Sequence, residues 1–318
     1  MPGPFFIAGT ARCGTTRLRQ VLGEHPEVYA VRWESRFIVD PGGFADAVLP
    51  LTEGYTPLRA QDTMRRLADM LACRVAGYGD GLMRGTGLLD EVGHDCYAQA
   101  VATLWERLTW YEFDTIVPPL SYRFGRWQYS PGEPRSAHAV VARHFTDRAE
   151  LIAAFREFTD TVFGAAARQA GKRIWCEKSP PGNLMFIPFL LELFPQATVV
   201  AVMRHPVHVA ASFLDQPWAP RTLADILHFL EPVYRSWLAA RPALLGDPRY
   251  LEVKSEELAE DWPRRRRKLF ADLELPDADT PSTFEPERLG HRDGQLDARQ
   301  RAEAEDGLGF AIQALGYA

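Results

Sequence analysis

Five short apolar runs are spaced along the sequence, and each has the length of a strand buried in a sheet. They are Phe5–Gly9, Val28–Val31, Ile174–Glu177, Thr198–Met203 and Tyr250–Val253. Between them, apolar residues recur every three or four positions, which predicts helices after the first run, across Leu184–Phe194 and after Pro206. Strands that alternate with helices predict a central parallel sheet flanked by helices, with its ligand site at the carboxyl ends of the strands. The expected fold class is therefore α/β.

The strand pattern disappears between about residues 41 and 172, where helical spacing predicts helices around Met64–Leu71 and Leu151–Val162. The same segment is rich in aromatic residues: Trp105, Trp110, Tyr111, Phe113, Tyr122, Phe124, Trp127 and Tyr129. We interpret residues 41–172 as a helical insertion that covers the strand ends and forms a ligand pocket. The alternative is that its aromatic residues pack the insertion's own core. Because no proline- or glycine-rich linker divides the chain, residues 1–318 are predicted to form a single domain.

The composition is that of a soluble globular protein, with 46% hydrophobic and 25% charged residues. The net charge of −6 argues against a non-specific nucleic-acid binder, so an anionic ligand would need a local cluster of cations. The four cysteines form no Cys-x-x-Cys pair and have no zinc spacing. No apolar stretch reaches the roughly 18 residues of a spanning helix, and no leader pattern precedes the first strand. These features predict a reduced, cytoplasmic protein.

The segment GTARCGTT joins the first predicted strand to the first predicted helix. Gly9, Gly14 and Thr16 have the spacing of the phosphate-binding pattern G-x-x-x-x-G-K-[ST]. Thr15 stands at the lysine position, and the nearby cation is Arg12. Successive backbone N–H groups at the start of a helix form an anion site. We therefore interpret the segment as a phosphate loop without its lysine; the alternative is a tight strand-to-helix turn.

Two further stretches place cations at strand ends. Arg204 follows the strand in VVAVMRHPVHVAAS, and Ser212 stands eight residues later on the next helix, so both can converge on one phosphate. Lys178 ends the short strand in WCEKSPPGN, where a cation usually needs an anionic partner. The alternatives are an arginine that only caps a strand end and a Lys178–Glu177 pair at the surface.

In their order along the chain, these three stretches resemble the sulfotransferase family that uses 3′-phosphoadenosine-5′-phosphosulfate (PAPS). TARCGTTRLRQVLGEHPEV resembles the family's 5′-phosphosulfate loop, RHPVHVAAS resembles its 3′-phosphate motif, and the tail from residue 288 to 317 resembles the C-terminal region of bacterial members. The resemblance implies PAPS as donor, adenosine 3′,5′-bisphosphate (PAP) as product, and no need for a metal. It also implies a cofactor-binding set: Arg12, Cys13, Gly14, Thr15 and Thr16 for the 5′-phosphosulfate, and Arg204 and Ser212 for the 3′-phosphate. A looser match places His291, Arg292 and Gly294 near the 3′-phosphate.

The candidate catalytic base follows the second predicted strand. Glu34-Ser35-Arg36 resembles the Glu-x-Arg of tyrosyl-protein sulfotransferases, whose glutamate is the base, so the resemblance gives this role to Glu34 and an orienting role to Arg36. It likewise matches Lys178 and Arg12 with the catalytic cations that steady charge on the leaving oxygen. Two alternatives stay open. One is a Glu34–Arg36 surface pair; the other is a base among the insertion histidines, which are His94, His138 and His144.

We therefore expect in-line transfer of a sulfuryl group from PAPS to an acceptor hydroxyl, with a small molecule as the leading acceptor and a peptide tyrosine as the alternative. A divergent phosphate-loop kinase is disfavoured by Thr15 at the lysine position and by the lack of a suitable aspartate at a strand end for magnesium. A non-catalytic nucleotide-binding module is disfavoured by the presence of Glu34 and Lys178. The sequence predicts neither a nucleic-acid partner nor a membrane span, and it leaves the oligomeric state open.

Overall fold

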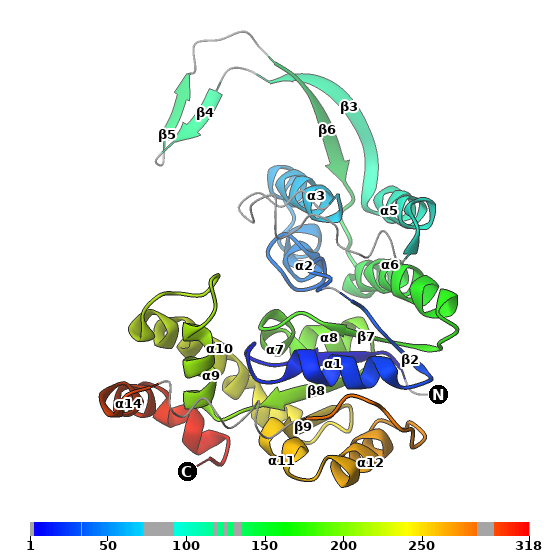
Figure 1. Ribbon diagram of the computed structural model, residues 1–318. Coiled ribbons are helices and arrows are strands. Elements are labelled where there is room, and N and C mark those ends of the chain that lie inside the picture. The colour runs from blue at the N-terminus through cyan, green and yellow to red at the C-terminus, as the bar shows by residue number, and fades with distance from the viewer. Residues whose placement is uncertain are drawn as a thin grey trace.

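The computed structural model describes residues 3–32, 34–72, 92–117, 120–123, 126–129, 135–284 and 296–317 (Figure 1). At its centre is a five-stranded sheet in the order β2-β7-β1-β8-β9, in which neighbouring strands run parallel. Its strands are β1 (Phe5–Ala8), β2 (Val28–Ala30), β7 (Ile174–Lys178), β8 (Thr198–Met203) and β9 (Tyr250–Lys254). The predicted parallel sheet is confirmed, and the ends of each strand lie within about one residue of the apolar run that predicted it.

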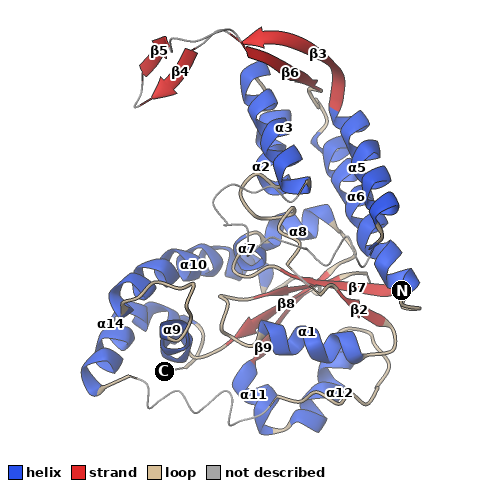
Figure 2. Cartoon of the chain, turned by 45° about the horizontal axis from the view of Figure 1, so that its top comes forward, coloured by secondary structure: helices blue, strands red, loops and turns tan. Residues whose placement is uncertain are grey.

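Helices cover both faces of the sheet. They are α1 (Thr15–Glu24), α7 (Gly182–Met185), α8 (Ile187–Leu193), α9 (Pro206–Leu214), α10 (Leu223–Leu244), α11 (Ser255–Glu260), α12 (Trp262–Asp272) and α14 (Ala298–Ala314). Figure 2 shows α1, α11 and α12 on one side of the sheet and α7 and α8 on the other. A strand covered on both faces is buried along its whole length, as β1 is, and this is why its sequence is apolar throughout.

The single helix expected across Leu184–Phe194 is divided into α7 and α8 at Phe186. Pro188 lies in the first turn of α8, where proline is tolerated because the amides there have no partner within the helix. In a longer helix the same residue would break a hydrogen bond, so the chain begins a new helix instead. Among the described residues, no helix is both long and apolar enough to cross a membrane.

The insertion combines helices with antiparallel strands. Its helices are α2 (Phe44–Leu51), α3 (Pro57–Leu71), α5 (His94–Leu108) and α6 (Arg148–Gln169). Its strands are β3 (Thr109–Val117) paired with β6 (Arg135–Ala142), and β4 (Leu120–Arg123) paired with β5 (Arg126–Tyr129). The expectation of a helical insertion is thus right for the helices and wrong for these strands. β3 is rich in aromatic and β-branched residues, but it is largely exposed and lacks the apolar run that marks a strand buried on both faces.

The β3/β6 pair, called the ribbon below, projects from the insertion on the side away from the central sheet (Figure 1, Figure 2). Trp110, Tyr111 and Phe113 are 65%, 61% and 44% exposed on the ribbon, so they lie largely in solvent and not in the expected pocket. Trp105 packs against the core from α5. The side chains of the remaining predicted aromatic residues lie outside the described part of the chain: Tyr122, Phe124, Trp127 and Tyr129.

An aromatic cluster joins the insertion to the sheet. Phe37, between β2 and α2, packs against Phe44, Phe158 and Phe163 with ring centroids 5.3–5.6 Å apart. Phe163 in turn lies 5.0 Å from the ring of Trp175 in β7. Aromatic contacts of this kind stabilise beyond the area that they bury. They anchor the segment that leaves the carboxyl end of β2.

Candidate active site

The sheet order brings the predicted site residues to one edge. Glu34 follows β2, Lys178 ends β7, the loop of residues 9–14 follows β1, and Arg204 follows β8. Parallel strands all end at the same edge, and neighbours lie about 4.8 Å apart. Because the strands are ordered β2-β7-β1-β8, these four features stand in that order along the edge, with the loop between Lys178 and Arg204. Residues nearly 200 positions apart in the sequence are thereby assembled into one site.

The loop between β1 and α1 has an unusual backbone. Ala11 and Arg12 have φ values of 63° and 58°, and Gly14 has 107°, all in the left-handed region that disfavours side chains. A Cβ at Gly9 would lie 2.7 Å from the Thr15 methyl group and against the Cys13 sulfur, so this position requires glycine. Gly14 brings no side chain to cap α1. The first amides of a helix have no partner within the helix, and here no side chain of the N-cap residue takes them, which favours an anion at this end of α1.

The loop meets the second predicted phosphate motif directly. Arg12 donates a hydrogen bond from Nε to the Ser212 hydroxyl at 3.1 Å. Arg204 donates from Nη1 to the Arg12 carbonyl at 3.1 Å. Both Arg204 and Ser212 are buried. A buried guanidinium favours an anionic partner, so two arginines and a hydroxyl beside a helix N-terminus are chemically suited to phosphate groups.

Cys13 lies inside the loop with its side chain buried. Burial raises the pKa of its thiol, although hydrogen bonds with Thr10 oppose this effect in part. The side chain therefore stays a neutral thiol that packs beneath the loop. Backbone amides of Thr10, Thr15 and Cys13 itself also bond to this sulfur, so the side chain supports the loop from within.

Glu34 lies between two cations. Lys178 donates from Nζ to Glu34 Oε1 at 2.8 Å, and Arg36 donates from Nη2 to Glu34 Oε2 at 2.7 Å. Arg36 also pairs with Asp40 at 2.9 Å. Burial raises the pKa of Asp40, and the Arg36 charge opposes that rise. The side chain of Glu34 remains 27% exposed, so its carboxylate is held in place and still open to a substrate.

The alternative of a Lys178–Glu177 surface pair is wrong. Glu177 is fully buried and accepts hydrogen bonds from Ser35, Ser179 and Asn183. Successive side chains of a strand point to opposite faces, so Glu177 and Lys178 cannot share a direction. The Glu34–Arg36 pair, considered as the alternative, is present, and Lys178 bonds to the same carboxylate.

Glu256, in α11, supports the turn that carries Arg204. Its carboxylate accepts hydrogen bonds from the His205 backbone N–H at 2.8 Å and from the Tyr317 hydroxyl at 3.1 Å. Burial raises the pKa of Tyr317, which keeps its hydroxyl a donor. The sequence motifs gave no signal for Glu256 or Tyr317, because both reach the site from other elements. The residues matched to the family's 3′-phosphate loop lie outside the described chain: His291, Arg292 and Gly294.

The three insertion histidines lie elsewhere. His94 is exposed at the start of α5, and His144 packs against the Tyr55 ring at 4.8 Å. His138, on β6, contacts Glu112 and Asp114 of the ribbon at 2.9 and 3.1 Å. None of these contacts involves a group at the sheet edge. The histidine alternative for the base therefore has no geometric support in the described residues.

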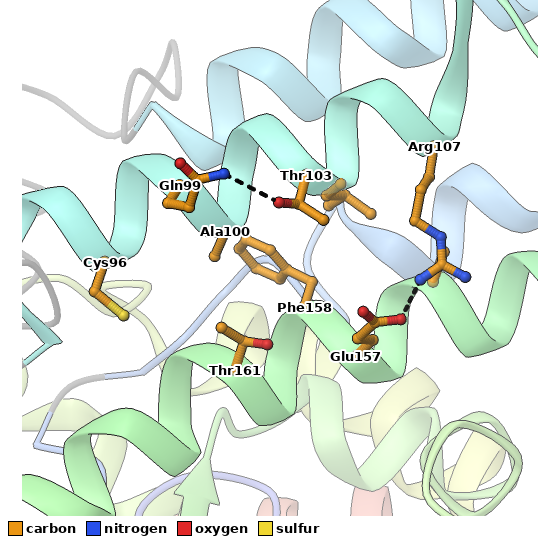
Figure 3. Close-up of a pocket in the computed structure, with 10 residues that line it drawn as sticks. Cys96, Gln99, Ala100, Thr103, Arg107, Glu157, Phe158 and Thr161 are labelled. Atoms are coloured by element: carbon orange, nitrogen blue, oxygen red, sulfur yellow. Dashed lines mark hydrogen bonds and ion pairs between the residues drawn. The ribbon is translucent and has the colours of Figure 1, made fainter.

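A cavity of about 300 Å³ lies between α5 and α6 (Figure 3). Its lining includes Cys96, Thr103, Arg107, Glu157 and Phe158, and the Arg107–Glu157 ion pair crosses it. None of the predicted site residues lines this cavity, which belongs to the insertion. We therefore place the candidate site at the sheet edge and not here.

The sequence model of the family described as "Sulfotransferase family" matches residues 101–279, more than half of the chain. The chain belongs to the sulfotransferase family. The resemblance found in the motifs is thereby confirmed, and the protein is an enzyme of the transferase class. The matched region includes Lys178, Arg204 and Ser212; the loop of residues 9–16 and Glu34 precede it.

The chain is also similar to one curated protein over a short stretch and to solved structures in its fold. A 95-residue stretch is 32% identical to nodulation protein NoeE of Sinorhizobium fredii (strain NBRC 101917 / NGR234); it spans 30% of this chain and only 22% of that relative. The fold of this sulfotransferase is similar to that of the sulfotransferase domain from the Synechococcus PCC 7002 olefin synthase, with a TM-score of 0.50, 16% identity, and 98% and 96% of the two chains covered. It is also similar to the sulfotransferase domain from the curacin biosynthetic pathway, with a TM-score of 0.51, 11% identity, and 97% and 98% covered.

Proposed function

We propose that this sulfotransferase uses PAPS as its donor and transfers the sulfuryl group to the hydroxyl of a small molecule. The observation that carries the proposal is the position of the Glu34 cluster. An accessible carboxylate held by Lys178 stands on the same sheet edge as the loop whose Arg12 reaches Ser212. A base and an anion site on one edge are what transfer between a nucleotide and a hydroxyl requires.

The donor set fits a nucleotide with phosphate at both ends. Thr15, Thr16 and the N-terminal end of α1 would hold the 5′-phosphosulfate, and Arg204 and Ser212 would hold the 3′-phosphate. Arg12 contacts Ser212 and would bridge the two. When bound, PAPS supplies a sulfuryl group attached to a phosphate that can leave. Because the protein carries a net charge of −6, these local cations must provide the attraction for the nucleotide.

In the proposed reaction, Glu34 takes the proton of the acceptor hydroxyl as the acceptor oxygen bonds to sulfur. The bond between sulfur and the phosphate oxygen breaks, and its electron pair stays on that oxygen. Lys178 stands beside β1, because its Cα pairs with Ile7 just before the loop. As Glu34 becomes neutral it attracts Lys178 less, and the ammonium can turn to the oxygen where negative charge grows. Arg36 keeps Glu34 oriented throughout.

The small-molecule acceptor and the compartment are part of the same proposal. Glu34 lies in the segment between β2 and α2 with its side chain partly exposed, which supports access by a small alcohol. A peptide tyrosine is the competing acceptor. Cys13, Cys96 and Cys176 are free thiols, which supports a reducing compartment such as the cytoplasm.

The donor is tested by calorimetric titration with PAP, ATP and GTP, followed by transfer from ³⁵S-labelled PAPS to phenols, sugar alcohols and tyrosine peptides. We expect strong binding of PAP alone, because only PAP engages Arg204 through a 3′-phosphate. Labelled product from an alcohol or phenol supports the small-molecule acceptor, and labelled peptide alone would reassign it. Turnover should persist in excess EDTA. Preferential ATP binding with magnesium-dependent phosphoryl transfer would replace the proposal with a kinase.

A further inference from the structure

Glu177 is a fully buried carboxylate at the carboxyl end of β7, next to Lys178. Its Oε1 accepts hydrogen bonds from the Ser35 backbone N–H at 3.1 Å, the Ser35 hydroxyl at 3.0 Å and the Ser179 hydroxyl at 2.5 Å. Its Oε2 accepts one from Asn183 Nδ2 at 2.9 Å. Burial raises the pKa of Glu177, and every one of these donors opposes that rise. A carboxylate removed from water persists only when such donors replace its hydration.

Asn183 is oriented for this carboxylate. Its Nδ2 donates both to Glu177 and to the Ile7 carbonyl at 3.1 Å, while its buried Oδ1 has no hydrogen-bond partner among the described residues. With the amide turned by 180°, the Asn183 oxygen would face two acceptors, the Glu177 carboxylate and the Ile7 carbonyl. The network therefore leaves one acceptor unsatisfied in order to keep a donor directed at Glu177.

The bonded groups flank the proposed catalytic pair. Ser35 immediately follows Glu34, and Ser179 immediately follows Lys178. The ladder between β2 and β7 ends at the Ala30–Cys176 pair, and among the described residues the Val31 N–H bond to the Cys176 carbonyl is the last backbone link beyond it. Past that point the Glu177 side chain ties the two segments together. Fixing the Ser35 N–H also fixes the peptide unit that leads from Glu34.

We infer that Glu177 is a positioning residue that holds the Glu34 segment against Lys178, so that base and cation meet in the productive geometry. The inference rests on the proposed function. Glu177 itself does no proton chemistry with substrate, because it is fully buried and both its oxygens are engaged. Its contribution is to set the separation of two groups on neighbouring strands.

The test compares Glu177→Gln and Ser35→Ala with the matched control Thr159→Val. Glu177→Gln keeps the shape but directs an amide donor at existing donors, and Ser35→Ala removes one hydroxyl bond from the Glu34 side. Thr159→Val removes a similar buried hydroxyl bond, to the Phe155 carbonyl at 2.8 Å, inside α6. Three quantities are measured: kcat for ³⁵S transfer from PAPS to 2-naphthol, Kd for PAP, and hydrogen exchange of the amides in residues 34–40.

A misplaced catalytic group lowers the rate without loss of nucleotide binding. We expect kcat to fall about 10²-fold in Glu177→Gln and less in Ser35→Ala, with Kd for PAP within about twofold of wild type. Amides 34–40 should exchange faster in both variants and not in Thr159→Val. If Glu177→Gln does not fold, Asn183→Ala, which removes the donor to the other carboxylate oxygen, is measured beside Ser35→Ala, and wild-type kcat and exchange in both would overturn the inference.

Two outcomes would overturn the inference. Wild-type kcat and exchange in Glu177→Gln would show that the tie to Glu177 does not position Glu34; the same result in Ser35→Ala would show that the Ser35 hydroxyl bond does not contribute to it. Equal losses in kcat and PAP binding in all three variants would mark a general loss of structure. Failure of the proposed function can be told apart from failure of this inference. In the first case the wild-type protein would transfer no label, whereas faster exchange of amides 34–40 in the variants would still show that Glu177 holds this segment. In that case the catalytic role of the tie falls with the function.

Discussion

The sheet edge and the ribbon each carry a carboxylate at hydrogen-bond distance from a basic group, yet their surroundings differ. At the edge, Lys178 and Glu34 are 2.8 Å apart with side chains 11% and 27% exposed. On the ribbon, His138 and Glu112 are 2.9 Å apart, but the His138 side chain is 55% exposed and that of its second partner, Asp114, is 92% exposed. Exposed pairs are screened by water and held loosely, whereas a half-buried cluster fixes its members. Similar distances between charged groups therefore do not show that two clusters have the same function.

The largest expected difference between the two regions is in catalysis. Glu34→Gln keeps the volume of the side chain but cannot take a proton, so the single-turnover rate should fall about 10²–10⁴-fold. Affinity for PAP should stay near wild type, because Glu34 stands on the acceptor side of Lys178. The matched change on the ribbon, Glu112→Gln, should leave the rate unaltered. A Glu34→Gln enzyme with a wild-type rate would remove Glu34 from the reaction.

Nucleotide affinity should distinguish the same regions by a smaller factor. Arg204→Ala removes a buried charge-assisted contact, a loss of about 1.5–3 kcal/mol that corresponds to a Kd for PAP raised by roughly one to two orders of magnitude. Arg143→Ala is the control, since Arg143 packs over the exposed Trp110 ring at the base of the ribbon, 5.2 Å from its centroid. Calorimetry should find its Kd unchanged. Equal Kd values for both variants would separate Arg204 from the nucleotide.

The smallest effect should come from the ribbon itself. Hydrogen bonds to Glu112 and then Asp114 raise the pKa of His138 above its ordinary 6.5. A raised pKa in the folded protein adds stability that is complete below pH 6.5 and is lost as the pH rises through the raised value. His138→Gln should therefore lower Tm by at most about 2 °C at pH 5–6, with the difference vanishing at higher pH. Its turnover should match wild type; a large loss of turnover would return His138 to the list of candidate bases.

The same contrast explains what could be predicted from the sequence. Strands buried on both faces, such as β1 and β8, are recognisable in the sequence as apolar runs. The loop motifs directly follow the ends of these runs. The ribbon has no such run because β3 is largely exposed, so the sequence pattern does not predict its strands. The edge positions of Glu34, Lys178 and Arg204 follow from sheet order, and the structure adds their contacts. Roles for these residues remain predictions.

Glu177 shows why part of the site escaped prediction. A Glu-Lys pair resembles an ordinary surface pair until the alternation of a strand is applied to it. Because Lys178 points to the site, Glu177 must point away from it. A carboxylate buried there is stable only when other segments supply hydrogen-bond donors. Ser35 is 142 positions away, and only the pairing of β2 with β7 brings it near. Contacts between distant segments of this kind leave no local pattern.

The burial of Cys13 also bears on how the protein meets oxidants and alkylating agents. Thiolates, not thiols, react, and the raised pKa of Cys13 keeps the thiolate form scarce in a place that reagents cannot reach. Peroxide or iodoacetamide should thus spare the loop while the protein stays folded. Cys96, partly exposed beside the α5/α6 cavity, is the more accessible of the described thiols. A fluorophore attached to Cys96 would therefore label the insertion and leave Cys13 in the loop unmodified.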